Sequence, residues 1–377
     1  MYELSSSQPT VGIVTYHKSL SYGGCLQAYA TQVVLEGFGC RAFFVDYENP
    51  YEARKKTNAV FKYGTTKERI AAVAKRVLYR QAAFQRKAFE SFHKDMPTSK
   101  RSYERIEQLR DFEVDTLLVA SDQVWNPLIT GGIDPVFFLD FGQARRKVSF
   151  ASSVGSYTFN SRERAEIARY LEGFDAVSVR ESFAREQLQT LIETDVRVVL
   201  DPTLQVASEK WREVASCPEG VFSEGYILVF MVSSSYQRYE KLLDRVRRHY
   251  DLPVIQVRLN AKRPPQVDCV VPATPFELVW LIDHAAFVLS DSFHGLAFSV
   301  NMETPFAALP NMKNNVRLQE LIDTFGLVSR LFVNGDFDGL FDSVDFSKAR
   351  LLLQERRGEE GVWLSQALRL GGGSCPA

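Results

Sequence analysis

Short apolar runs alternate with helix-like segments along most of this chain, and this alternation limits the possible folds more than any other feature. The first set begins with TVGIVTY, continues with a helical pattern that stops at Gly37 and Gly39, and resumes with the apolar run CRAFFVDY. A strand, a helix and a second strand in this order are the unit of a parallel sheet. The pattern recurs as far as the segment DPTLQVASEKW and then starts again with YILVFMV.

Two successive sets of this size predict an α/β protein with two Rossmann-like domains that face each other across a cleft. We expect residues 1–205 to form the first domain, with a helical insertion at about residues 54–110. Residues 206–345 should form the second domain, with the hinge near Pro202. Within residues 346–377 we expect a helix that returns to the first domain, followed by a flexible tail.

The insertion has an unusual charge balance. From Arg54 to Arg110 there are sixteen Lys or Arg residues against five Asp or Glu residues. Apolar residues recur there at roughly helical spacing, which predicts an amphipathic helix. Two interpretations remain open: a packed insertion with a solvated basic face, which is the commoner case, or a surface for an anionic partner such as a lipid diphosphate or a membrane face. These apolar residues are Ile70, Val73, Val77, Phe84, Phe89 and Phe92.

The composition argues against several classes of protein. A formal net charge of -1 over 377 residues gives no indication of nucleic-acid binding. No apolar run approaches the roughly 20 residues of a membrane span, and the polar N-terminus lacks the parts of a signal peptide. The five cysteines are odd in number and none forms a CxxC pair, so we expect reduced thiols in a cytoplasmic protein, with neither a disulfide framework nor a zinc site.

Ligands of open α/β sheets bind beyond the carboxyl ends of the strands, so polar residues that follow apolar runs are the candidates for a site. Ser121 and Asp122 follow one such run, and Trp125 and Asn126 close the turn after it. This turn could simply cap a helix, or an exposed tryptophan beside a carboxylate could face a sugar ring. Arg180 ends another run, where it either forms a salt bridge or binds a carboxylate or phosphate.

The stretch LSDSFHG places an imidazole where a buried strand gives way to an apolar helix. Asp291 or Ser292 should cap that helix, and His294 should lie in its first turn. The positive end of the helix dipole disfavours an imidazolium there by up to about 1 kcal/mol, whereas a bound dianion would favour it. An anion site and a core histidine bonded to a carbonyl are both consistent with this stretch. After the first strand, Gly23 and Gly24 permit close approach of the backbone at another helix start.

Taken in order, these stretches resemble the polysaccharide pyruvyl transferase family. The resemblance runs from YGGCLQAYA through SDQVWNP, FFLDF, VSFASSVGS, VSVRES, VLDPTL and LSDSFHGLAFSV to NNVRLQELIDTFGL. It implies a GT-B-like fold and an enzyme that moves the enolpyruvyl group of phosphoenolpyruvate onto a sugar of a polysaccharide or of a lipid-linked precursor, forming a pyruvate ketal and releasing phosphate. It implies no metal and no cofactor, phosphoenolpyruvate being a co-substrate.

The resemblance also assigns roles. His294 stands at the position of the catalytic histidine, and Arg180 matches the arginine that holds the donor from the first domain. Arg317 is a candidate for a second cation. Ser292 stands where many members of the family have an arginine, so the donor contact there must come from its hydroxyl or from helix N–H groups. Histidine suits the general acid that protonates phosphoenolpyruvate near neutral pH.

The remaining candidates complete the predicted site. Asp122 or Asp291 is expected to deprotonate the acceptor hydroxyl. Further donor contacts are expected from Ser121 and Phe293, and acceptor contacts from Tyr22, Gln27, Trp125 and Asn126.

Two other functions remain open at this stage. The first is a GT-B-type glycosyltransferase that uses a nucleotide sugar. The second is a non-catalytic homologue that binds glycans or lipids, for which the serine at position 292 is the best support. For the pyruvyl transferase, the acceptor is expected to be lipid-linked, so that the cytoplasmic protein would contact a membrane face peripherally.

Overall fold

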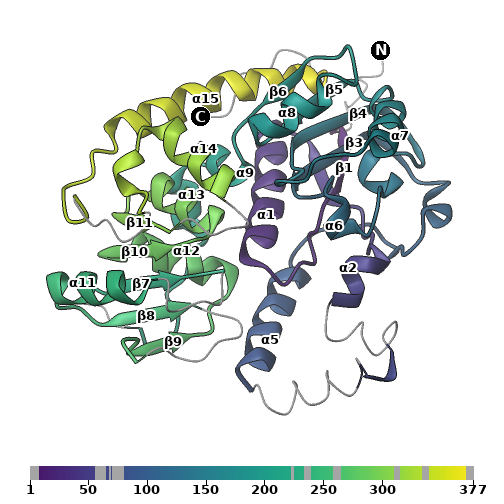
Figure 1. The fold of residues 1–377 in the computed structure, drawn as a ribbon. Coiled ribbons are helices and arrows are strands. Elements are labelled where there is room, and N and C mark those ends of the chain that lie inside the picture. Colours follow the sequence, from purple (N-terminus) through teal and green to yellow (C-terminus); the bar gives the residue numbers. More distant parts are fainter. Residues whose placement is uncertain are drawn as a thin grey trace, which may run out of the picture.

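Two separate parallel sheets divide the protein into two α/β domains, as a computed structural model shows (Figure 1). The predicted fold class, two Rossmann-like domains facing each other, is therefore confirmed. The structure describes residues 8–55, 65–67, 69, 80–221, 225–232, 239–257, 265–309, 315–332 and 339–370.

The sheet of the first domain has six parallel strands in the order β2-β1-β3-β4-β5-β6. Helices cover both of its faces, so its central strands are apolar on both sides, as in β3, where residues 117–121 are all buried. The strands are β1 (Thr10–Val14), β2 (Arg41–Phe44), β3 (Glu113–Asp122), β4 (Gln143–Ser152), β5 (Ala176–Val179) and β6 (Val196–Val198).

The sheet of the second domain has five parallel strands in the order β11-β10-β7-β8-β9. All four residues of its central strand β7 are buried. The strands are β7 (Ile227–Phe230), β8 (Val254–Val257), β9 (Cys269–Val271), β10 (Phe287–Ser290) and β11 (Phe306–Ala308).

Helices connect the strands and also fill the space between the two sheets, where α1, α9, α12 and α13 pack together (Figure 1). The largest apolar core accordingly contains residues of both domains, such as Leu26 and Leu296. The helices are α1 (Tyr22–Gly37), α2 (Pro50–Lys55), α5 (Arg80–Lys94), α6 (Pro127–Thr130), α7 (Ser161–Leu171), α8 (Ser182–Leu188), α9 (Pro202–Gln205), α10 (Ser208–Val214), α11 (Glu240–Tyr250), α12 (Pro275–Asp283), α13 (Phe293–Met302), α14 (Asn315–Phe325) and α15 (Ser347–Ala367), with 3₁₀ turns at Ile106–Leu109, Pro135–Phe138 and Val328–Arg330.

The chain crosses between the domains twice. It leaves the first sheet after β6 and passes through α9 and α10 to β7. It returns along α15, which lies across the top of both domains in Figure 1. A carboxylate oxygen of Glu360 in α15 accepts a hydrogen bond of 2.8 Å from the Leu200 amide, and Arg146 of β4 donates to the Ala367 carbonyl at 2.6 Å. The last helix is thus bonded to the first domain.

The described part of the basic insertion also joins the two domains. In α5, Phe89 is fully buried and its ring lies 5.0 Å from that of Tyr22 in α1. Phe92 packs edge-on against Phe276 of α12, with ring centroids 5.0 Å apart.

Among the described residues, no helix is both long enough and apolar enough to span a bilayer. The predicted apolar positions Ile70, Val73 and Val77, and the side chain of Phe84, lie outside the described part.

Candidate functional site

Asp201, at the turn from β6 to α9, is the centre of a buried polar cluster at the boundary of the two domains. Its Oδ1 caps α9 by accepting from the Thr203 amide at 2.9 Å and from the Thr203 hydroxyl at 2.7 Å. Its Oδ2 accepts from the Ser121 hydroxyl at 2.9 Å and from Nη1 of Arg180 at 2.7 Å. Three strands of one parallel sheet supply these groups because their carboxyl ends share an edge.

His294 approaches the same carboxylate from the second domain. It lies in the first turn of α13, and its Nε2 is 3.7 Å from Oδ2 of Asp201. On its other side the ring lies against α1, so closely that a Cβ atom at Gly23 would be 2.1 Å from Nδ1 of His294. The imidazole is thus held between a carboxylate and a glycine of the first domain, at a point where two helix N-termini meet.

Arg180 has hydrogen-bonding capacity that its neighbours do not use. Its Nη1 is bonded to Asp201, whereas Nε and Nη2 are buried and have no hydrogen-bond partner among the described residues. The carboxylate of Glu181 is 3.6 Å from Nε, and the ring of Phe293 lies over the guanidinium at 4.7 Å. A buried donor without a partner is rare and calls for an explanation, such as a bound ligand.

Arg317, near the start of α14, lies on the same interdomain hollow as Arg180, Asp201 and Phe293; the hollow measures about 50 Å³. Burial, and then the nearby charge of Arg180, lower the pKa of Arg317. Burial also disfavours the charge of Arg180, but Asp201 and Glu181 raise its pKa overall. Two guanidinium groups close enough to affect each other are stabilised by an anion placed between them.

The charge of Asp201 survives complete burial. Burial alone would raise the pKa of its carboxyl, but the interactions with His294 and Arg180 lower the pKa far below the ordinary value. With these partners in place, the carboxyl group is therefore expected to be ionised near neutral pH.

Asp122 ends β3 in a strained conformation. Its φ angle is 82°, which is unusual for a residue other than glycine and costs of the order of 1–3 kcal/mol. The half-buried carboxylate accepts from the Gln123 amide at 2.8 Å and interacts electrostatically with Arg180 and Arg317. Such strain is concentrated at functional sites, and this carboxylate is near enough to both guanidinium groups to affect their pKa values.

The expectation of an exposed tryptophan is wrong. Trp125 is 1% exposed, its indole N–H donates to the Phe137 carbonyl at 2.8 Å, and its ring stacks on Phe138. Asn126 caps α6 by accepting from the Leu128 amide at 3.0 Å. Of the two predicted acceptor contacts, Trp125 is thus a packing residue, covered by Phe137 and Phe138, and Asn126 is a capping residue.

Tyr22 and Gln27 are also engaged within the protein rather than open to an acceptor. The Tyr22 hydroxyl donates to the Ala273 carbonyl of the second domain at 2.7 Å. Gln27 is fully buried and donates to the Thr15 hydroxyl at 2.9 Å and to the Gly24 carbonyl at 3.0 Å. Tyr22 thus links the domains, and Gln27 fixes the loop that leads into α1.

The two residues before Phe293 have separate structural tasks. Ser292, not Asp291, caps α13, with its hydroxyl accepting from the Gly295 amide at 3.4 Å. Asp291 is buried, and its Oδ1 accepts from the Val232 amide at 2.6 Å. This carboxylate therefore anchors the loop after β7 within its own domain, and its role as an alternative base to Asp122 stays a prediction.

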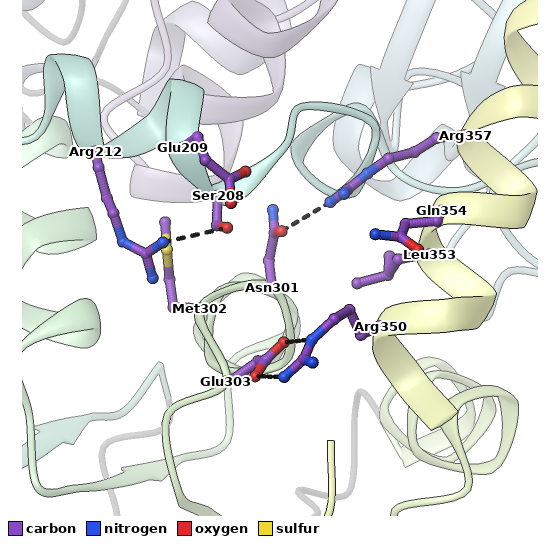
Figure 2. A pocket seen from close by; sticks show the side chains of 10 residues that line it. All are labelled: Ser208, Glu209, Arg212, Asn301, Met302, Glu303, Arg350, Leu353, Gln354 and Arg357. Carbon is purple, nitrogen blue, oxygen red and sulfur yellow. Dashed lines mark hydrogen bonds and ion pairs between the residues drawn. The ribbon is translucent and has the colours of Figure 1, made fainter. Parts of the chain in front are cut away.

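A second cavity, of about 220 Å³, lies near the other end of α13 (Figure 2). Side chains of α10, α13 and α15 surround it, and three of them are arginines. Each arginine has partners: Arg350 pairs with Glu303, Arg212 with Asp283, and Arg357 with the Asn301 side chain. The three arginines of this cavity are thus already paired with other groups of the protein.

The central residue of the cluster is not among the site residues predicted from the sequence. Asp201 stands in VLDPTL, at the predicted domain boundary. The signal that could have found it is its place directly after a strand, as for Ser121 and Asp122. The contact between Gly23 and His294 had no signal in the sequence, because the two residues come from different domains.

The fold and the cleft define a two-domain α/β protein of the GT-B type, with its candidate site between the domains. Among solved structures, S. aureus MnaA with UDP is similar, at a TM-score of 0.51 and 12% identity over 98% of this chain and 99% of that chain. Os79 from O. sativa in complex with UDP is similar at a TM-score of 0.50 and 10% identity, over 95% of this chain and 98% of that chain. At these identities the likeness is one of fold.

The chain belongs to the polysaccharide pyruvyl transferase family, whose model matches residues 22–314, and it is accordingly a transferase. The matched range includes α1, the Asp201 turn and α13. A comparison with curated proteins found no match. Within the described residues, no group of three or more His, Cys, Asp or Glu side chains is arranged to hold a metal ion.

Proposed function

We propose that this protein transfers the pyruvyl group of phosphoenolpyruvate to a saccharide, with release of phosphate and formation of a pyruvate ketal. One observation carries the proposal: Arg180 has buried N–H groups without a hydrogen-bond partner among the described residues, and it lies on the same hollow as Arg317, close to a histidine that can act as an acid. Phosphoenolpyruvate carries a carboxylate and a phosphate, both of which suit the planar fork of arginine.

Entry of the donor requires Phe293 to move away from Arg180. The hollow of about 50 Å³ has room for only a few water molecules, and the Phe293 ring covers the guanidinium at 4.7 Å. Phe293 belongs to α13 of the second domain, whereas Arg180 belongs to the first. Separation of the domains would expose the arginine, and closure over the donor would bring His294 to it.

In the proposed reaction His294 donates a proton to C3 of phosphoenolpyruvate, which makes C2 electrophilic. A hydroxyl of the acceptor adds to C2 and loses its proton to a base. The C2–O bond to phosphate then breaks, and a second hydroxyl adds to C2 and loses its proton as the ketal closes. Of the two protons lost by the hydroxyls, one replaces that of His294 and the other leaves with phosphate. The reaction as written needs neither a metal nor a cofactor.

Asp122 is the proposed base. It is half-buried, it interacts with both arginines, and its backbone is held in an unusual conformation at the end of β3. A carboxylate within reach of the donor cations is placed to accept a proton from a hydroxyl that attacks C2.

The acceptor is proposed to be lipid-linked, with the basic insertion helping to position it. Lys87 and Lys94 are both exposed and lie seven residues apart on α5, hence on one side of that helix. Reversing both charges (Lys87→Glu with Lys94→Glu) should raise KM for a lipid diphosphate acceptor and leave the binding of phosphoenolpyruvate unchanged. An unchanged KM for that acceptor would show that these two lysines of the insertion do not position it.

The deciding experiment is a donor assay. The protein is incubated with phosphoenolpyruvate and a panel of free and lipid-linked saccharides, and phosphate release and the ketal methyl signal are followed by NMR. Parallel incubations contain nucleotide sugars in place of phosphoenolpyruvate. Release of nucleoside diphosphate alone would indicate a glycosyltransferase, and saccharide binding with neither donor consumed would indicate a non-catalytic homologue; either result overturns the proposal.

A further inference from the structure

We propose that Asp201 is the positioning residue of the general acid: it orients His294 and supplies its counter-charge, but only while the two domains are closed. The inference rests on the proposed function of His294. It is carried by the contact of a first-domain carboxylate with a second-domain imidazole, at 3.7 Å between Oδ2 and Nε2.

The carboxylate is rigid. Four donor groups from three residues hold its two oxygens, at distances of 2.7 to 2.9 Å. Its side chain is completely buried. A carboxylate fixed in this way cannot turn to follow the imidazole. Nε2 of His294 is buried without a hydrogen-bond partner among the described residues, 3.7 Å from Oδ2, so the ring must approach the fixed oxygen for the bond to form. Gly23 closes off the opposite side of the ring.

The charge balance around the imidazole depends on Asp201. The charged groups at the cluster are Arg180 and Glu181 after β5, Asp122 at the end of β3, and Arg317 from α14; α13 itself carries no charged side chain besides His294. Asp201 lies between Arg180 and His294. Without its negative charge, the imidazolium would face the guanidinium with no anion between them, and protonation of His294 would be disfavoured.

The pair is also divided between the domains. Asp201 is bonded to Ser121 and Arg180 of the first domain, whereas His294 lies in α13 of the second. Opening of the cleft would therefore take the imidazole away from its counter-charge. The acid is complete only in the closed state, which joins proton donation to enclosure of the substrate.

The test is the titration of His294, followed by NMR of histidine-labelled protein. The signal of His294 is identified as the one that disappears in His294→Ala. In Asp201→Asn, which keeps the shape of the side chain, the titration curve of His294 should move to lower pH by about one unit or more. Asp283→Asn is the matched control, because that carboxylate pairs with an arginine of the other pocket and should leave the curve unchanged. An unmoved curve in Asp201→Asn overturns the proposal.

Kinetics provide a second readout. Asp201→Asn should lower kcat about 10- to 100-fold in the wild-type background and by less than about threefold in His294→Ala, because the two residues act as one unit. Equal losses in both backgrounds would mean that Asp201 acts on something other than the acid. The NMR titration needs no turnover, so the inference and the proposed reaction can fail separately.

A pair of variants covers the case in which Asp201→Asn does not fold because Arg180 is left buried and unpaired. Arg180→Gln is compared with the double variant Arg180→Gln, Asp201→Asn, so that no unpaired arginine remains in either protein. The titration curve of His294 should lie about one pH unit or more lower in the double variant. Coincident curves overturn the proposal.

Discussion

Two hollows of this protein are each lined by three arginines, yet only one of these six described arginines, Arg180, has buried N–H groups without a hydrogen-bond partner. In the pocket of Figure 2 each arginine has hydrogen-bond partners, and no buried N–H of the three is without one in the described structure. In the cleft, Nε and Nη2 of Arg180 are buried without a hydrogen-bond partner there. The arginines are Arg212, Arg350 and Arg357 in the pocket, and Arg180, Arg317 and Arg356 in the cleft.

The difference shows that the number of cations does not identify an anion site. What matters is the donor capacity left after the protein has made its own bonds. The pocket of Figure 2 is the larger of the two, at about 220 Å³ against about 50 Å³, but its arginines bond α10 to α12, and α15 to α9 and α13. In the smaller hollow, Arg180 has buried N–H groups without a hydrogen-bond partner among the described residues, and the hollow is lined by Phe293, the neighbour of His294 in the chain.

The largest expected effect is that of His294→Ala. General acid catalysis contributes roughly 10²- to 10⁴-fold, so kcat should fall by that order, while thermal unfolding stays near that of the wild type. His284→Ala is the control, since His284 is exposed at the end of α12 in the same domain. Turnover that persists in His294→Ala at saturating donor would mean that the histidine is structural and that the cleft does not hold the general acid.

Gly23→Ala should have nearly as large an effect. The added Cβ would lie 2.1 Å from Nδ1 of His294, so the ring must leave its position against Asp201. We expect kcat to fall about 10²-fold, within the range for loss of a positioned acid. Gly358→Ala in α15 is the matched control, because a Cβ there meets nothing within 4 Å. Equal activity of the two variants would show that the position of the His294 ring between Gly23 and Asp201 is not needed for catalysis.

Arg180→Lys tests the comparison directly. Lysine keeps a positive charge for Asp201 but lacks the planar fork, so KM for phosphoenolpyruvate should rise about tenfold, with a smaller change in kcat. Arg357→Lys is the same substitution in the other pocket and should leave KM unchanged. If the two variants behaved alike in a donor titration, unsatisfied N–H groups would not distinguish the two hollows.

Arg357→Met should affect stability instead of activity. The guanidinium donates to the Leu204 carbonyl at 2.7 Å and to Oδ1 of Asn301 at 2.8 Å, and these acceptors would lose their partner. A loss of about 1–3 kcal/mol in the free energy of unfolding is expected from denaturant titration. An unchanged free energy, or a raised KM for phosphoenolpyruvate, would contradict a purely structural role.

The smallest effect is expected for Glu303→Gln. The hydrogen bond from Arg350, acting against partial burial, lowers the pKa of Glu303. The pair therefore stabilises the folded state above the ordinary pKa of a glutamate, and this contribution is lost as the pH falls from that value through the lowered pKa of the folded state. Because the Arg350 side chain is exposed, the loss of stability at pH 7 should be small and should decrease with salt. A destabilisation that persisted at a pH well below the lowered pKa would contradict an ionic origin.

The sequence predicted the two sheets well because buried parallel strands leave a plain signal. The run FVLS of β10 is buried at all four positions, and so is ILVF of β7. Their alternation with helices determines the order of elements, and the carboxyl ends of the strands then share an edge. This is why Ser121, Arg180 and His294 were correctly expected near strand ends.

The remaining features of the site depend on contacts that no local pattern contains. Asp201 meets Ser121, 80 residues earlier in the chain, and His294 of the other domain. The position of Asp201 before a proline indicates a helix start at a domain boundary. Nothing in the local sequence indicates that its Oδ2 also accepts hydrogen bonds from Ser121 and Arg180. The burial of Trp125 could not be predicted from its neighbours in the chain, because the Phe138 ring that stacks on it follows only after α6.

The return of α15 to the first domain has a consequence for biosynthesis. Residues that complete the surface of the first domain are synthesised after the whole second domain, since Glu360 provides the acceptor for the Leu200 amide. Domains generally fold as units, the N-terminal one first, as the chain emerges. Until α15 has been synthesised, the Leu200 amide of the first domain lacks this partner. We therefore expect the first domain to complete its packing only after the second has been made.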